Sequence, residues 1–98
     1  MYYSPVVSFS WDPKKARANL KKHGVSFTEA ATVFSDPYAV WSPDKNHPER
    51  GLLTGCSSEE RLLVVVHVEI VDEETIRIVS AWKAGRQERR RYETGEDD

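Results

Sequence analysis

The hydrophobic pattern of the chain changes its period at Pro37. Before this proline, apolar residues recur every three or four positions, as on an amphipathic helix. After it, they alternate with polar residues, as on a half-buried strand. A chain of 98 residues has room for a single hydrophobic core. The pattern therefore predicts one α+β domain, in which helices pack on a sheet built from the second part of the chain.

Two helices are predicted before Pro37. The first helix is predicted over residues 14–23. It begins after the N-cap Asp12 and a first-turn proline, and it ends at Gly24, which can adopt the left-handed conformation. The apolar stripe expected on this helix consists of Ala16, Leu20 and His23. A capping box from Ser26 to Glu29 begins the second helix, whose expected buried face consists of Phe27, Ala30, Ala31 and Phe34.

Four strands are predicted after Pro37, and a short one before the first helix. The four cover residues 38–41, 50–54, 61–70 and 75–81, and the short candidate covers residues 6–9. Because the link between the last two long strands is short and polar, we expect an antiparallel meander. In the strand over residues 61–70, the even positions are apolar throughout, so we expect the even face to be the core.

The predicted fold class is α+β, with two N-terminal helices and a C-terminal helix packed on a four-stranded antiparallel sheet. We expect residues 1–98 to form a single domain. Residues 1–8 are expected to form an N-terminal arm or short strand, and residues 94–98 an acidic tail.

Cations are concentrated in two segments, although the chain has a formal net charge of -2. These segments are residues 14–22 and 77–91, and such a polarised surface suits a phosphate-bearing partner. No apolar run approaches the roughly 20 residues of a membrane helix, so no membrane contact is expected. Because Cys56 is the only cysteine, no intramolecular disulfide can form. We therefore expect a cytoplasmic protein.

The segment over residues 42–50 combines acid–base and anion-binding groups. It contains His47, Glu49 and Arg50 within four positions. Histidine exchanges a proton near neutral pH, glutamate can orient it or act as a base, and arginine can hold a phosphate through two parallel hydrogen bonds. The spacing also fits a solvated loop in which Glu49 and Arg50 merely form an exposed ion pair.

The basic C-terminal helix offers a second set of phosphate ligands. Its arginines point around the whole axis, with Arg89 and Tyr92 on one face. On the preceding strand, Arg77 and Lys83 have the same parity, opposite to Ile78 and Trp82. These positions allow Arg77, Lys83 and one helix arginine to converge on one phosphate. Alternatively, the arginines of this helix are exposed to solvent and bind no ligand.

Histidine spacing argues against a metal site. The three histidines are scattered, and no pair of His or Cys has the spacing of metal ligands. We expect no metal and no other cofactor. His67 is expected to be a hydrogen-bonded structural residue of the sheet.

The chain resembles the BrnT family of toxins from about residue 9 to residue 93. The resemblance is carried by residues 9–16, 22–30 and 33–37 in the first half. Asn19 also belongs to the first-half pattern. In the second half the resemblance is carried by residues 62–66 and 77–81, together with Glu49, Arg50, Gly55, Glu88, Arg89 and Tyr92. It implies the toxin half of a type II toxin–antitoxin pair with a RelE-like ribonuclease fold. It also implies metal-independent RNA cleavage, in which the ribose 2′-hydroxyl attacks the adjacent phosphate.

The resemblance also implies a set of site residues and partners. Lys22 and His23 are expected at the edge of the site and Glu49 and Arg50 on its floor, completed by Arg77, Arg89 and Tyr92. To these we add His47 as proton carrier, with Lys83 and Arg86 as further RNA contacts. The expected partners are an RNA substrate and a cognate BrnA-like antitoxin that binds DNA, so that DNA contact is indirect. Either a homodimer or a heterotetramer with the antitoxin would fit.

Two positions depart from the pattern of the resemblance. Ile70 and Trp82 stand where we expect cations. Loss of a charged contact made mainly in the transition state lowers a rate by a hundredfold or more. Two functions therefore stay open. One is an endoribonuclease toxin with full or attenuated activity. The other is a weak or inactive toxin-fold module that acts through antitoxin binding and promoter autorepression.

Overall fold

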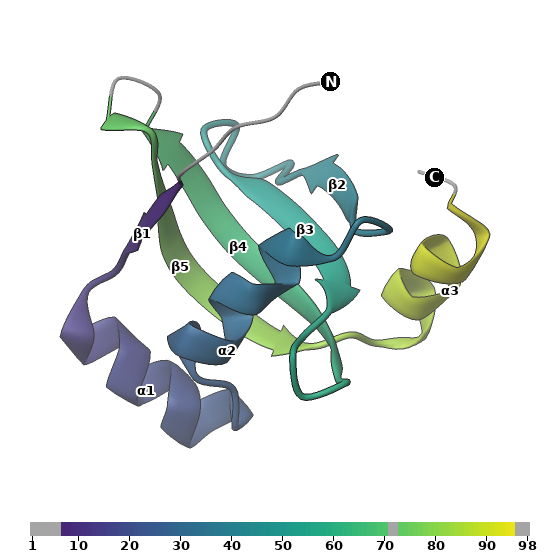
Figure 1. Ribbon diagram of the computed structural model, residues 1–98, viewed down its shortest axis with the longest axis horizontal. Coiled ribbons are helices and arrows are strands. Elements are labelled where there is room, and N and C mark those ends of the chain that lie inside the picture. The colour runs from purple at the N-terminus through teal and green to yellow at the C-terminus, as the bar shows by residue number, and fades with distance from the viewer. Residues whose placement is uncertain (1–6, 71–72, 96–98) are drawn as a thin grey trace.

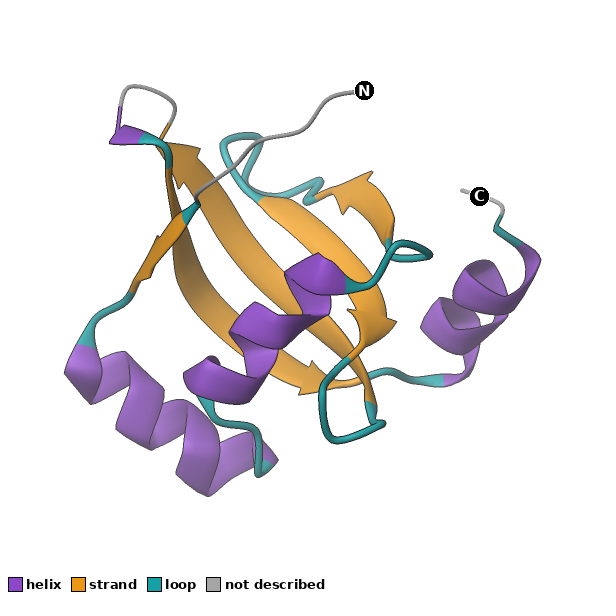
Figure 2. Ribbon diagram, viewed as in Figure 1, coloured by secondary structure: helices purple, strands orange, loops and turns teal. Residues whose placement is uncertain are grey.

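The computed structural model describes residues 7–70 and 73–95. Along the chain lie β1 (Ser8–Ser10), α1 (Pro13–His23), α2 (Phe27–Thr32), a 3-10 turn η1 (Val33–Ser35), β2 (Val40–Pro43), β3 (Gly51–Cys56), β4 (Leu62–Ile70), β5 (Thr75–Lys83) and α3 (Arg86–Thr94). Figure 1 shows α2 in front of the sheet, α1 at the lower left next to α2, and α3 beside the end of β3. Helices and strands separate clearly along the chain in Figure 2, apart from the short first strand.

The sheet has five strands in the order β1-β5-β4-β3-β2. The predicted meander of β2 to β5 is confirmed, since each of these strands pairs antiparallel with the next. The prediction of a four-stranded, wholly antiparallel sheet is wrong, because β1 adds a fifth strand parallel to β5, from Ser8 opposite Thr75 to Ser10 opposite Arg77. The predicted strand over residues 6–9 is thus shifted toward the helix, and Val6 lies outside the described residues.

The first helix has the predicted caps but a different buried face. Asp12 accepts a hydrogen bond from the backbone N–H of Lys14 at 2.9 Å, and Gly24 ends the helix at a φ of 70°. The prediction that Leu20 is buried is wrong, because its side chain is 51% exposed and Asn19 is the buried residue. The amide of Asn19 bonds to the backbone of β5, and this turns the next position outward.

Only half of the predicted capping box forms at the start of α2. Ser26 Oγ accepts a hydrogen bond from Glu29 N–H at 3.0 Å. The Glu29 carboxylate is instead engaged by Arg61 and by the Ser57 hydroxyl. The expected apolar face is present, with Phe27 and Ala30 buried in the core beside Val33 of the 3-10 turn.

The helices cover the odd-numbered face of β4. The buried cluster beneath α1 and α2 contains Val25, Phe27, Ala30, Val33, Leu63, Val65, Ile78 and Ala81. The prediction that the even face of β4 is the core is therefore wrong for the helical side of the sheet. The centre of the even face is buried as well, since Val64 is 1% exposed and Val66 4%. A strand buried on both faces gives no unambiguous signal in its alternation.

A β-bulge changes the face on which the side chains of β5 lie. The register shifts between Val66, opposite Ser80, and His67, opposite Ile78, so Val79 is an extra residue on β5. Arg77 therefore lies on the even face and Lys83 on the helical face. The prediction that these two cations share a face and converge is wrong, as is the prediction that Ile78 and Trp82 share one.

Candidate active site

The loop between β2 and β3 brings three predicted site residues together. His47 Nδ1 and Arg50 Nε each lie 3.8 Å from Glu49 Oε2. The turn is held by backbone hydrogen bonds, from His47 N–H to Asp44 O at 3.1 Å and from Arg50 N–H to His47 O at 2.8 Å. The side chains of His47 and Glu49 are 50% and 60% exposed, so a ligand can reach them.

The strand register, extended by one residue beyond β3, assigns Arg50 to the same face and the same end of the sheet as Arg77. Arg77 pairs with Val68 on β4, and Arg50 directly precedes Gly51, which pairs with His67. Extending that register by one residue puts Arg50 on the other side of Val68 from Arg77. Two strand spacings separate the two backbones, about 10 Å. Long arginine side chains at this spacing can contact one phosphodiester group from two sides.

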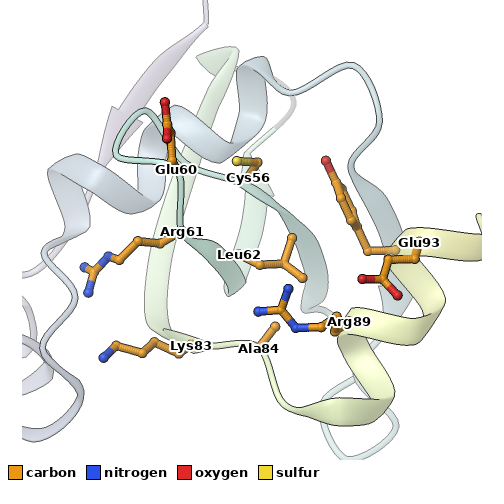
Figure 3. Close-up of a pocket in the computed structure, with 9 residues that line it drawn as sticks. Cys56, Glu60, Arg61, Leu62, Lys83, Ala84, Arg89 and Glu93 are labelled. Carbon is orange, nitrogen blue, oxygen red and sulfur yellow. The ribbon is translucent and has the colours of Figure 1, made fainter.

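Lys83, Arg89 and Tyr92 lie around a separate pocket of about 480 Å³ at the far end of the sheet, in an arrangement shown in Figure 3. Arg89 extends from α3 toward Leu62 and Ala84, and the lining also includes Cys56, Glu60, Arg61 and Glu93. This volume is within the range of small-ligand sites. The lining contains three cations and two carboxylates, so its charge is mixed.

Tyr92 is held by a hydrogen bond rather than left free as a base. Its hydroxyl donates to Asp36 Oδ2 at 2.8 Å, and this bond raises the pKa of Tyr92 to about 12. Burial raises the pKa of Asp36, but hydrogen bonds from the backbone N–H of Cys56 and Tyr38 and from Tyr92 outweigh burial, and the net pKa is lowered. The pair thus stays as phenol and carboxylate near neutral pH.

Lys22 and His23 lie in a third place, where the end of α1 meets β5. They line a shallow groove with Lys15, Asn19 and Ser80. The His23 ring lies 6.1 Å from the Trp82 ring, measured between centroids. Arg86 is exposed at the first position of α3.

The predicted site residues thus fall into groups at opposite ends of the sheet. His47, Glu49, Arg50 and Arg77 lie where β3 begins, and Lys83, Arg89 and Tyr92 where it ends. Five residue steps of extended strand separate these ends, about 17 Å. One mononucleotide cannot touch both groups, whereas a longer strand of nucleic acid can.

Three residues shape these regions without having been predicted to do so: Asn19, Asp36 and Arg61. Asn19 is tied to Ala81 and Ser80, Asp36 to Tyr92, and Arg61 to Glu29. Their partners lie 32 to 62 positions away, so no local pattern links them. The one available signal is polarity, because Asn19 and Asp36 are polar residues next to apolar runs.

Among residues 7–70 and 73–95, no group of three or more His, Cys, Asp or Glu side chains is placed to hold a metal ion. No helix in the same part of the chain is long and apolar enough to cross a membrane.

Comparison with known proteins gives one family and one fold. The sequence model of a family described as "Ribonuclease toxin, BrnT, of type II toxin-antitoxin system" matches residues 11–88. A search of curated proteins found no match. Among solved structures, the crystal structure of the Brucella abortus ribonuclease toxin BrnT is similar, with a TM-score of 0.66 and 20% sequence identity, covering 83% of this chain and 100% of that one. At this identity the structural match concerns the fold alone.

Proposed function

The chain belongs to the BrnT family of ribonuclease toxins of type II toxin–antitoxin systems, and from this premise we propose that it is a metal-independent endoribonuclease. It cleaves RNA in the cytoplasm, arrests growth, and is neutralised by a cognate DNA-binding antitoxin. One observation carries the proposal: Arg50 and Arg77 face the same side of the sheet, with His47 and Glu49 next to Arg50. This arrangement combines phosphate ligands with an imidazole that can accept a proton.

In the proposed reaction, the ribose 2′-oxygen attacks the adjacent phosphorus while the bond from phosphorus to the 5′-oxygen breaks. His47 takes the proton of the 2′-hydroxyl, and the Glu49 carboxylate on its Nδ1 side stabilises the imidazolium that forms. Arg50 and Arg77 stabilise the negative charge that develops on the phosphate oxygens. The leaving 5′-oxygen takes a proton from solvent, and the products are a 2′,3′-cyclic phosphate and a 5′-hydroxyl.

The groups at the other end of the sheet hold the RNA rather than react with it. Lys83 and Arg89 bind phosphates about 17 Å from the reacting one, a distance set by the length of β3. Tyr92, with a pKa of about 12, stays protonated and holds α3 in place through Asp36. Lys22, His23 and Arg86 add cationic contacts along the same RNA.

The test is cleavage of ribosome-free RNA by antitoxin-free protein in the presence of EDTA. We expect fragments with 2′,3′-cyclic phosphate ends, and a loss of rate of about a hundredfold or more in Arg50→Ala and Arg77→Ala. Arg17→Ala, which removes an exposed arginine of α1, is the matched control and should cleave normally. All variants should keep their melting temperature and antitoxin affinity. Full activity of both Arg50→Ala and Arg77→Ala would refute this site.

A specific observation favours a second function, that of a toxin-fold binding module without strong catalysis. Trp82 lies beside His23 where a cation was expected, and the predicted catalytic residues do not converge on one point. Such a module would bind the antitoxin and support promoter repression while leaving RNA intact. If no purified variant cleaves RNA, a growth-arrest assay separates it from a ribosome-dependent nuclease, because only the nuclease arrests growth.

A further inference from the structure

Trp82 lies at the open edge of the sheet, on the face that carries Arg77. Its strand partner is Val64, on the face turned away from α1 and α2. Pairing between β1 and β5 stops at Arg77, so no strand of the described chain covers the edge of β5 beyond that residue. Within residues 7–70 and 73–95, the side chain of one residue, Asn19, bonds to the backbone of this edge. It donates to Ala81 O and accepts from Ala81 N–H. The indole is therefore partly exposed beside the end of α1.

A groove that contains two lysines begins next to this indole, at His23. The groove between α1 and β5 is lined by Lys15, Lys22 and His23 together with Ser80, and among the described residues no carboxylate lines it. The His23 ring is tilted at 47° to the Trp82 ring. An aromatic ring bordered by cations is the combination with which proteins hold single-stranded nucleic acid, through base stacking and phosphate contacts.

We infer that Trp82 stacks on a base of single-stranded RNA while Lys15 and Lys22 contact the phosphates beside it. The inference rests on the proposed function, and it adds a specificity-determining residue to it. Because Trp82, Ser80 and Arg77 face the same side of β5, a strand of RNA that lies along this face leads from the stacked base to the proposed reacting phosphate. The tryptophan thus helps to set which phosphodiester bond reaches Arg50 and Arg77.

A purely structural role of Trp82 makes a different prediction. Val64, opposite Trp82, is only 1% exposed, so the indole also covers part of the core. Trp82→Leu keeps an apolar cover over Val64 but removes the ring. Trp82→Phe keeps both the cover and a ring. The pair of variants separates stacking from packing.

The experiment measures binding of a fluorescently labelled, single-stranded oligonucleotide whose riboses are all 2′-O-methylated, so that no cleavage can occur. We expect Trp82→Leu to weaken binding about tenfold, and Trp82→Phe to stay within about threefold of the parent protein. Trp41→Leu is the matched control, because it removes a tryptophan that is 55% exposed on the opposite face. Melting temperatures show whether the variants remain folded.

Lys15→Ala and Lys22→Ala should each reduce the dependence of binding on salt by about one counterion. Unchanged RNA binding by Trp82→Leu would overturn the inference. Loss of antitoxin binding in Trp82→Leu with normal RNA binding would also overturn it, because the surface would then serve a protein partner. Loss of RNA binding in Trp82→Leu would support the stacking role even if the parent protein and Arg50→Ala both failed to cleave RNA, and only the proposed catalysis would then fail.

Discussion

His67 is a buried histidine that the fold keeps neutral. The Phe34 ring packs edge-on against the imidazole, with 4.9 Å between the ring centroids. The Nδ1 atom of His67 lies 3.2 Å from Val65 O. Only 4% of the residue is exposed. Burial lowers its pKa, although contacts with Val65 and Glu69 act in the opposite direction. The predicted structural role of His67 is therefore confirmed by its surroundings.

This burial predicts that acid destabilises the protein through His67. The pKa of His67 is about 6.5 in the unfolded chain and lower in the folded chain. Between these two pKa values, His67 is protonated in the unfolded chain but not in the folded chain. The free energy of unfolding should therefore fall as the pH falls through this window. Urea unfolding at pH 7.5 and pH 5.5 measures the change, and His67→Gln should flatten it. An equal pH dependence in His67→Gln would show that other groups are responsible.

At the scale of an element, α3 is the part of the fold with the weakest attachment. None of the residues from Arg86 to Thr94 is buried, and the helix packs mainly against β3. Its N-terminus is closed locally, since Glu88 Oε1 accepts the N–H of Gly85 at 2.6 Å. The bond between Tyr92 and Asp36 is a main link from the helix to the rest of the chain.

Tyr92→Phe should therefore loosen α3 without unfolding the sheet. Asp36 keeps its hydrogen bonds from Cys56 N–H at 2.7 Å and Tyr38 N–H at 2.9 Å, so the loss is confined to the helix. We expect α3 amides to be destabilised against exchange by about 1–2 kcal/mol, and β4 amides to be unaffected. Hydrogen exchange resolved by residue measures both, with Arg90→Ala as the control on the same helix. Unchanged exchange in α3 would mean that other contacts hold it.

At the scale of the whole molecule, buried polar contacts join segments that are distant in sequence. The Glu29 side chain is 3% exposed and forms an ion pair with Arg61, which ties α2 to the turn before β4. The Arg61 guanidinium lowers the pKa of Glu29 against the opposing effect of burial. Asn19 joins α1 to β5 in the same manner, and its amide also donates to Val25 O at 3.0 Å.

Removal of Arg61 should destabilise the whole domain. Arg61→Ala leaves a buried carboxylate without its cation, and we expect a loss of about 3 kcal/mol in the free energy of unfolding. Adding Glu29→Gln to this variant removes the uncompensated charge and should restore part of the stability. Chemical unfolding of the parent, single and double variants gives the three values. If Arg61→Ala unfolds at the same urea concentration as the parent, the ion pair contributes nothing.

The sequence alone determined those features that depend on neighbouring residues. Caps, turns and hydrophobic period predict the start of α1 at Asp12 and its end at Gly24. They also predict the approximate positions of the four later strands and the buried face of α2. The proximity of His47, Glu49 and Arg50 also follows, because they belong to one short loop. The family membership belongs here as well, since a pattern spread over residues 11–88 is a property of the sequence.

Only the tertiary structure decided which residues face the same way and which ends of the sheet they occupy. The extra residue Val79 reverses the side on which Arg77 lies relative to Lys83, and no local pattern reveals it. Contacts between distant segments decide three further features: the parallel pairing of β1, the burial of Asn19 on α1 and the separation of Arg50 from Arg89. The physical reason is that strand register and helix orientation are fixed by burial and hydrogen bonding across the whole core, whereas a sequence pattern reports only the preferences of adjacent residues.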